Sequence, residues 1–151
     1  MIYLEQLIHN KILISGIVGW ASAQVLKTII FLIVNKRFEI ERLFGDGGMP
    51  SGHSATVAAV ALSSGLEYGL DSPYFAVAMI MAIIVMHDAS GVRLETGKQA
   101  KVLNEMSDIV QKLGGTDLTY NEKLEEFVGH TPFQVAMGCA LGFVVAIVLH
   151  L

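Results

Sequence analysis

GGMPSGHSATVAAVALSSGLEYGL, residues 47–70, joins a loop containing Gly and Pro to a long run of Ala, Ser, Gly and Val. Ser51 stands where a helix N-cap is expected, because its side chain can accept a hydrogen bond from the first turn. Small residues on every side suit a helix that packs closely among other helices instead of facing lipid. The stretch therefore predicts a capped helix from Gly52 to Leu70 inside a helical bundle.

The start of this helix also suits an anion. First-turn N–H groups have no partner within a helix, and the helix dipole favours negative charge there. Gly52 removes a steric obstacle, and His53 adds a side chain that can donate a hydrogen bond or a proton. A purely structural interpretation remains open, in which Ser51 only caps the helix and His53 is an ordinary first-turn residue.

The composition places the chain in a membrane. Its 151 residues are 53% hydrophobic and only 16% charged, with a mean hydropathy of +0.57. The length suits a single domain over residues 1–151. A net charge of −4 and the lack of a basic block argue against nucleic acid as a partner. The single Cys139 lies in an apolar run, so no disulfide can form within one chain.

Three further apolar segments accompany Gly52–Leu70. Lys11–Val34 is long enough to cross a bilayer, which takes about 20 residues, and it lacks the features of a signal peptide. Tyr74–Met86 and Phe133–Leu151 are also strongly apolar. Together with Gly52–Leu70 they predict an all-α, polytopic membrane helical bundle with four spans.

A polar, periodic segment separates the last two spans. Leu94–Leu113 carries apolar residues at helical spacing with charges between them, which predicts an amphipathic helix. This helix is expected either to lie on or beside the membrane or to pack on the bundle. Gly114 and Gly115 end it, and Thr119–Glu122 has the pattern of a capping box that opens a short helix through Phe127.

Lys27 is a charged residue inside Lys11–Val34, the first predicted span along the chain. A charge in a spanning segment is costly and usually faces the bundle interior or a polar cavity. Gln24 is three residues before Lys27 and shares its helix face, with Trp20 one turn earlier. Snorkelling is the alternative, although Val34 at the end of the span is roughly 10 Å away along the helix.

Alternating spans bring the polar segments to one side of the membrane. That side then holds the candidate residues His53, His87, Asp88, Arg93 and His130. Because most basic residues lie there, the positive-inside rule places this face in the cytoplasm and both termini outside. On the other side lies Lys11 alone. The basic residues of the polar side are Lys36, Arg37, Arg42, Arg93, Lys98, Lys101, Lys112 and Lys123.

Three motifs occur in order along the chain. They are GGMPSGHSA at 47–55; DASGVR at 88–93, followed by GKQA at 97–100 and LN at 103–104; and GHTP at 129–132, before Gln134. Together they resemble the divergent membrane family related to type 2 phosphatidic acid phosphatases, over almost the whole chain. The resemblance implies a membrane phosphatase that hydrolyses a lipid phosphate or pyrophosphate through a phosphohistidine intermediate, with no metal or other cofactor.

The resemblance also implies roles for individual residues. His130 matches the nucleophile, and His53 matches the acid that protonates the leaving oxygen. Arg93 would help to hold the transferring phosphoryl group, although Asp88 could instead pair with it structurally. The residues that would bind substrate are Lys27, Ser51, Gly52, Asp88, Lys98 and Gln134.

The chain departs from the pattern of the wider superfamily in three places. Val34 and Asn35 stand where the first motif has Arg-Pro, and residues 123–125 lack the arginine of the third motif. Gln134 occupies the position of an Asp that orients the nucleophile. In an analogous His–Asp pair, loss of the carboxylate costs about 10⁴ in rate. A Gln can orient a ring N–H but adds no charge.

Two other classes of function remain open. The first is a catalytically degenerate protein that binds or transports an anionic lipid on the same scaffold. The second is a metal site built from His53, His87, Asp88 and His130, which ranks last because no pair among them has helical i, i+4 spacing. The expected partners are the bilayer and a membrane lipid phosphate, and four short spans with a polar interior make a homodimer plausible.

Overall fold

The computed structural model describes residues 2–37, 47–113, 123–126 and 128–151. Among these residues the regular structure is entirely helical, so the predicted all-α class is confirmed. The helices are α1 (Ile2–Ile8), α2 (Lys11–Asn35), α3 (Gly52–Tyr68), α4 (Pro73–Ser90), α5 (Val92–Lys112) and α6 (Pro132–His150).

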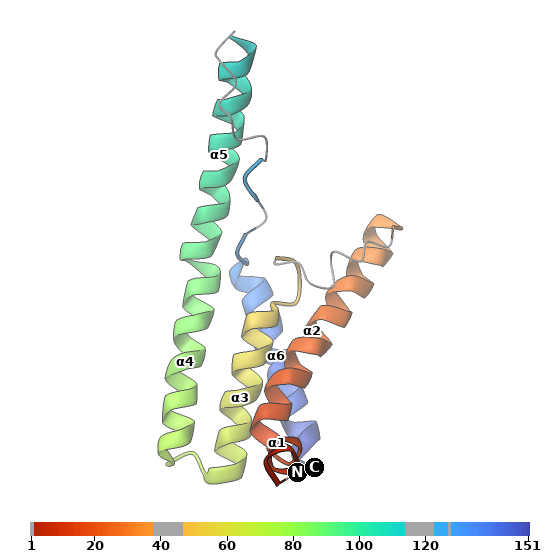
Figure 1. Cartoon of the computed structure of the whole chain (residues 1–151), viewed down its shortest axis with the longest axis vertical. Helices are drawn as coiled ribbons and strands as arrows, with labels where there is room; N and C mark the ends of the chain where they lie inside the picture. Colours follow the sequence, from red (N-terminus) through yellow and green to blue (C-terminus); the bar gives the residue numbers. More distant parts are fainter. Residues whose placement is uncertain (1, 38–46, 114–122, 127) are drawn as a thin grey trace.

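Helix α3 is the centre of the bundle. It packs against α2, α4 and α6, and Figure 1 shows it between α2 and α4. Small residues make these approaches close: a Cβ on Gly142 of α6 would overlap the carbonyl oxygen of Ala55 on α3. A Cβ on Gly16 of α2 would lie 2.8 Å from the side chain of Val60. The predicted close packing of this helix among others is therefore confirmed.

The number of spans differs from the prediction of four. Within the described part of the chain, three helical segments are long and apolar enough to cross a membrane: Lys11–Asn35, Pro73–Lys112 and Pro132–His150. Helix α3 has 17 residues, and its buried face consists of Gly, Ala and Ser. Because other helices cover it, α3 does not need the large apolar side chains that a lipid-facing span presents. The chain is an integral membrane protein with α3 enclosed by its longer helices.

Helix α5 continues the direction of α4 and projects beyond the ends of the other helices (Figure 1). Among the described helices α5 contacts α4 alone, so it does not pack along the bundle, and its expected placement on or beside the membrane stays a prediction. The reason for the shared direction of α4 and α5 lies at Gly91, whose N–H still donates to the carbonyl oxygen of His87 at 2.9 Å, as in a continuous helix. The polar run at the end of α4 therefore redirects the chain only slightly.

The chain returns from α5 along the surface of that helix. The buried side chain of Asn104 donates to the carbonyl oxygen of Leu124 (2.9 Å) and to the carboxylate of Glu126 (2.8 Å), and accepts from the N–H of Leu124 (3.0 Å). Residues 123–126 are not helical, so the prediction of a helix through this segment is wrong there. The predicted capping box, Thr119–Glu122, lies outside the described residues.

Four polar helix ends meet at one end of the bundle. They are the C-terminal end of α2, the N-terminal end of α3, the C-terminal end of α4 and the N-terminal end of α6 (Figure 1). Both chain termini lie at the opposite end. The gathering of the polar segments, which sequence reasoning derived from alternating helix directions, is present in the fold.

Candidate functional site

A cavity of about 330 Å³ lies at the polar end of the bundle, between α2, α3, α4 and His130, which stands two residues before α6. It brings together four of the predicted site residues, Lys27, Gly52, His53 and His130. The remaining walls are formed by Trp20, Gln24, Thr56, Val57 and Val85.

The two histidines face the same small volume. Their ring centroids are 6.0 Å apart, and the ring planes are tilted by 58°. His130 is only 2% exposed, whereas His53 is half-buried in the first turn of α3. A ligand the size of a phosphate group placed in the cavity can therefore contact both rings.

Backbone contacts fix the position of His130. Its N–H donates to the carbonyl oxygen of Ala89, near the end of α4, at 2.9 Å. The preceding Gly129 has φ +87°, in the left-handed region, and a Cβ there would overlap the backbone of Leu94. Only glycine allows this approach without strain, so the α4–α5 junction determines where His130 lies.

Ser51 has the structural role that its N-cap position predicts. Its fully buried hydroxyl accepts hydrogen bonds from the N–H (3.3 Å) and the hydroxyl (3.0 Å) of Ser54. The N–H of Ser51 donates to the carbonyl oxygen of Gln134 at 3.1 Å. This N–H is therefore already occupied, and Gly52 and His53 supply the part of the helix start that lines the cavity.

Lys27 points into the bundle. It is only 7% exposed, although it lies in the middle of a membrane-spanning helix. Its aliphatic stem runs beside Gly48, where an added Cβ would lie 3.2 Å from Cγ of the lysine. The inward orientation, and not snorkelling toward the membrane surface, is the one present.

Gln24 is a cavity residue to which sequence reasoning gave no role. It is 8% exposed, and its Oε1 has no hydrogen-bond partner among the described residues. A buried polar atom without a partner costs free energy, roughly 1–3 kcal/mol, and such atoms usually meet water or a ligand. Its spacing of three residues from Lys27 was the signal that could have identified it.

Three charged residues predicted for the site, Arg93, Asp88 and Lys98, lie outside the cavity, as do Ser51 and Gln134. Arg93 forms an ion pair with Asp88, with 2.9 Å between Nε and Oδ2, and both side chains are about half exposed. Lys98 on α5 pairs with Glu95 at 2.7 Å in an exposed position. The structural pairing of Asp88 with Arg93, left open by the sequence, is present.

Gln134 is engaged within its own helix start. Its side-chain oxygen accepts from the N–H of Thr131 at 2.9 Å, and the hydroxyl of Thr131 accepts from the N–H of Gln134 at 3.3 Å. This is a capping box that stabilises the first turn of α6. The carbonyl group that would have to orient His130 is used for this cap.

The metal alternative finds no ligand cluster in the described part of the chain. No three His, Cys, Asp or Glu side chains gather there closely enough to hold a metal ion. His87 is exposed and, like Asp88, is not part of the cavity wall.

The motifs and the cavity can be compared with known proteins. A model of the Divergent PAP2 family matches residues 8–145. The chain belongs to this family. It is 36% identical to the uncharacterized membrane protein YuiD of Bacillus subtilis (strain 168), over 95% of this chain and 96% of that protein. No solved structure matches the chain. All cavity residues of this Divergent PAP2 family protein fall within the matched range.

The cavity of this Divergent PAP2 family protein is suited to an anion. Lys27 contributes a basic side chain, and the start of α3 contributes the first-turn N–H groups of Gly52 and His53 at the positive end of a helix dipole. The remaining walls include the apolar side chains of Val57, Val85 and Trp20. Charge-assisted hydrogen bonds are strong in such surroundings.

Proposed function

We propose that this protein hydrolyses a lipid phosphate or pyrophosphate, with His130 as the nucleophile and His53 as the general acid. One observation carries the proposal: a single cavity holds two imidazoles 6.0 Å apart together with the buried Lys27. The location of this cavity in an apolar membrane protein favours a substrate that is itself a lipid.

The reaction would proceed in two steps. A ring nitrogen of neutral His130 attacks phosphorus, and an N–P bond forms as the bond to the leaving oxygen breaks. His53 gives its proton to that oxygen, a transfer typically worth about 10² to 10⁴ in rate. Water then attacks the phosphohistidine while the neutral His53 takes a proton from that water, the N–P bond breaks, and phosphate leaves with His130 and protonated His53 restored. Lys27 and the first-turn N–H groups of α3 stabilise the negative charge of the transferring group.

Arg93, Asp88 and Lys98 have a more peripheral place in this proposal. The guanidinium of Arg93 is bonded to Asp88, so a phosphate that binds Arg93 must compete with that carboxylate. Lys98 likewise lies beside Glu95. We assign to these residues contacts with the lipid headgroup outside the cavity, on a face that the positive-inside rule places in the cytoplasm.

A specific observation favours a second candidate function, binding or transport of an anionic lipid without hydrolysis. The side chain of Gln134 is committed to the capping box with Thr131. No carboxylate therefore orients His130 from the position where the superfamily has Asp. Anion binding by Lys27 and the start of α3 does not depend on that carboxylate.

Phosphate release by the purified protein in detergent, from a panel of lipid phosphates and pyrophosphates, tests the proposal. We expect His130→Ala to abolish turnover and His53→Ala to lower it by about 10² to 10⁴. A labelled substrate should leave acid-labile, base-stable phosphate on the wild-type protein and none on His130→Ala. His9→Ala, an exposed histidine outside the cavity, is the matched control and should retain full activity.

The alternative outcomes are distinct. Turnover that survives in His130→Ala would contradict the phosphohistidine mechanism. Absence of turnover in the wild type, with saturable lipid-phosphate binding that Lys27→Met weakens, would establish the binding or transport function instead.

A further inference from the structure

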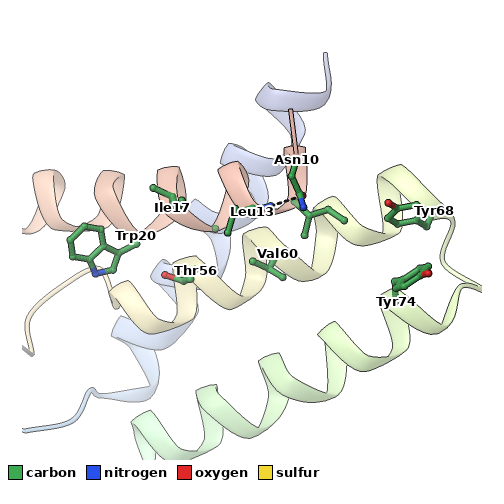
Figure 2. A pocket seen from close by; sticks show the side chains of 10 residues that line it. Asn10, Leu13, Ile17, Trp20, Thr56, Val60, Tyr68 and Tyr74 are labelled. Carbon is green, nitrogen blue, oxygen red and sulfur yellow. Dashed lines mark hydrogen bonds between the residues drawn. The ribbon is translucent and has the colours of Figure 1, made fainter. Parts of the chain in front are cut away.

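A second hollow, of about 810 Å³, runs along the bundle beside the cavity. Figure 2 shows it as a groove with α2 on one side and α3 on the other. Leu13 and Ile17 of α2 and Val60 of α3 form its middle part. The side chains that line this described groove are uncharged and mostly apolar.

The groove and the cavity share part of their walls. Trp20 and Thr56 line both hollows. In Figure 2 these two residues lie at one end of the groove, with Tyr68 and Tyr74 at the other. One extended ligand could therefore have a polar group beside His53 and His130 and an apolar part in the groove.

The dimensions of the groove fit a lipid chain. From Thr56 to Tyr68 is about 18 Å along α3 at the helical rise. Half of a bilayer hydrocarbon core, the depth that one leaflet's chains occupy, is about 15 Å. The rings of Tyr68 and Tyr74, with centroids 4.8 Å apart, lie at the far end.

The hydrocarbon chain of a lipid can reach the groove from the side. Leu13 and Ile17 are 41% and 56% exposed, although they belong to a membrane-spanning helix. The surroundings of these side chains are therefore the hydrocarbon of the bilayer, from which a lipid chain can slide between α2 and α3 without crossing water.

We propose that the groove is the chain subsite of the lipid whose phosphate occupies the cavity. The ligand class is an anionic lipid with a terminal phosphate group and at least one linear hydrocarbon chain. This inference rests on the proposed function for the chemistry at the headgroup. Trp20 and Thr56 lie at the junction, beside the bond between the phosphate and the chain.

The single tryptophan of the chain gives a direct test. Bromine quenches indole fluorescence on contact, so hexadecyl phosphate brominated near its phosphate end should quench Trp20 when the chain enters the groove. We expect saturable quenching by this compound. Brominated hexadecanol at the same mole fraction in detergent, which has the chain without the phosphate, should quench much less.

A pair of double variants tests whether the hydrocarbon chain of the lipid lies in the groove. Leu13→Phe with Ile17→Phe narrows the groove and should weaken the saturable quenching severalfold. The matched control is Ile29→Phe with Ile33→Phe, two exposed residues of α2 with the same spacing that do not line the groove. The fluorescence of the control should be quenched as in the wild type. All four positions are exposed enough for the helix to tolerate the larger side chain.

Turnover supplies an independent readout. For wild type and control we expect kcat/KM to rise from butyl through octyl to hexadecyl phosphate. The groove variant should lose most of this rise while hydrolysing butyl phosphate normally. Phosphate-dependent quenching without any turnover would overturn the proposed hydrolysis and support the chain subsite. Equal quenching by brominated hexadecanol, or a groove variant that quenches like the control, would overturn the chain subsite.

Discussion

The absence of a side chain at position 129 determines where His130 lies. Gly129 has φ +87° and approaches the backbone of Leu94 so closely that a Cβ would overlap it. We predict that Gly129→Ala displaces the histidine, since both the backbone conformation and the contact must change. Turnover should fall by about 10² or more, as expected for a misplaced catalytic group. Phosphate release per folded protein measures this.

Gly69→Ala separates displacement of the histidine from general backbone strain. Gly69 has φ +90° in the turn after α3, at the opposite end of the bundle, and an added Cβ would meet the flexible side chain of Asp71. The free energy of unfolding of Gly69→Ala should fall by about 1–2 kcal/mol from the positive φ alone. The loss in Gly129→Ala should be larger, because its Cβ also overlaps the backbone of Leu94. The turnover of Gly69→Ala should be retained. Equal activity losses in the two variants would contradict the positioning role of Gly129.

At this scale, sequence reasoning found the residues with distinctive chemistry. His53 and His130 were expected on one side of the membrane, and Lys27 was expected to face the bundle interior from its span. All three line one cavity, because helix direction brings the two histidine segments to the same end of the bundle. Gln24 was not assigned, since its unpartnered oxygen becomes visible only once the neighbouring helices are in place. The capping role of Gln134 depends on side-chain direction, which a motif does not specify.

Helix α5 supports residues 123–126, the segment that leads toward His130. Asn104 makes three hydrogen bonds to residues 124 and 126, and Lys123 pairs with Asp108 at 3.2 Å. We predict that Asn104→Ala loosens this segment and lowers stability by about 1–3 kcal/mol, because buried partners lose their hydrogen bonds. Thermal unfolding and the rate of tryptic cleavage after Lys123 measure the two effects.

Asn35→Ala is the matched control for that change. The amide of Asn35 donates only to the carbonyl oxygen of Phe31 within its own helix, in an exposed position. Its removal should change neither unfolding nor cleavage appreciably. If Asn104→Ala behaved in the same way, the segment would have to be held by other contacts.

Two elements show why the ends of every helix and the number of spans could not be predicted from the sequence. The sequence predicted separate helices at Tyr74–Met86 and Leu94–Leu113, yet Gly91 between them keeps the helical hydrogen bond to His87. Helix α3 resembled a fourth span by its length and small apolar residues. Its enclosure by α2, α4 and α6 depends on tertiary packing, which composition reports only indirectly.

For the molecule as a whole, the orientation in the membrane can be tested by labelling cysteines that are introduced one at a time, because the native chain has only Cys139. On a Cys139→Ser background, Lys101→Cys places a thiol on exposed α5, and Asp71→Cys places one in the turn at the opposite end. If the cavity faces the cytoplasm, a membrane-impermeant maleimide should label Asp71→Cys in intact spheroplasts. Lys101→Cys should be labelled only after lysis. The reverse pattern would invert the proposed orientation.

Helix α2 is longer than the membrane that it crosses. Its 25 residues span about 37 Å, against a hydrocarbon core of about 30 Å, whereas the 19 residues of α6 span about 28 Å. Such an excess is accommodated by tilt, and α2 leans away from α3 toward the polar end (Figure 1). A thicker bilayer would let α2 stand more upright and bring Lys27 closer to His53. Hydrophobic mismatch would thereby change the width of the cavity, and lipids of different acyl length would be a means of adjusting it.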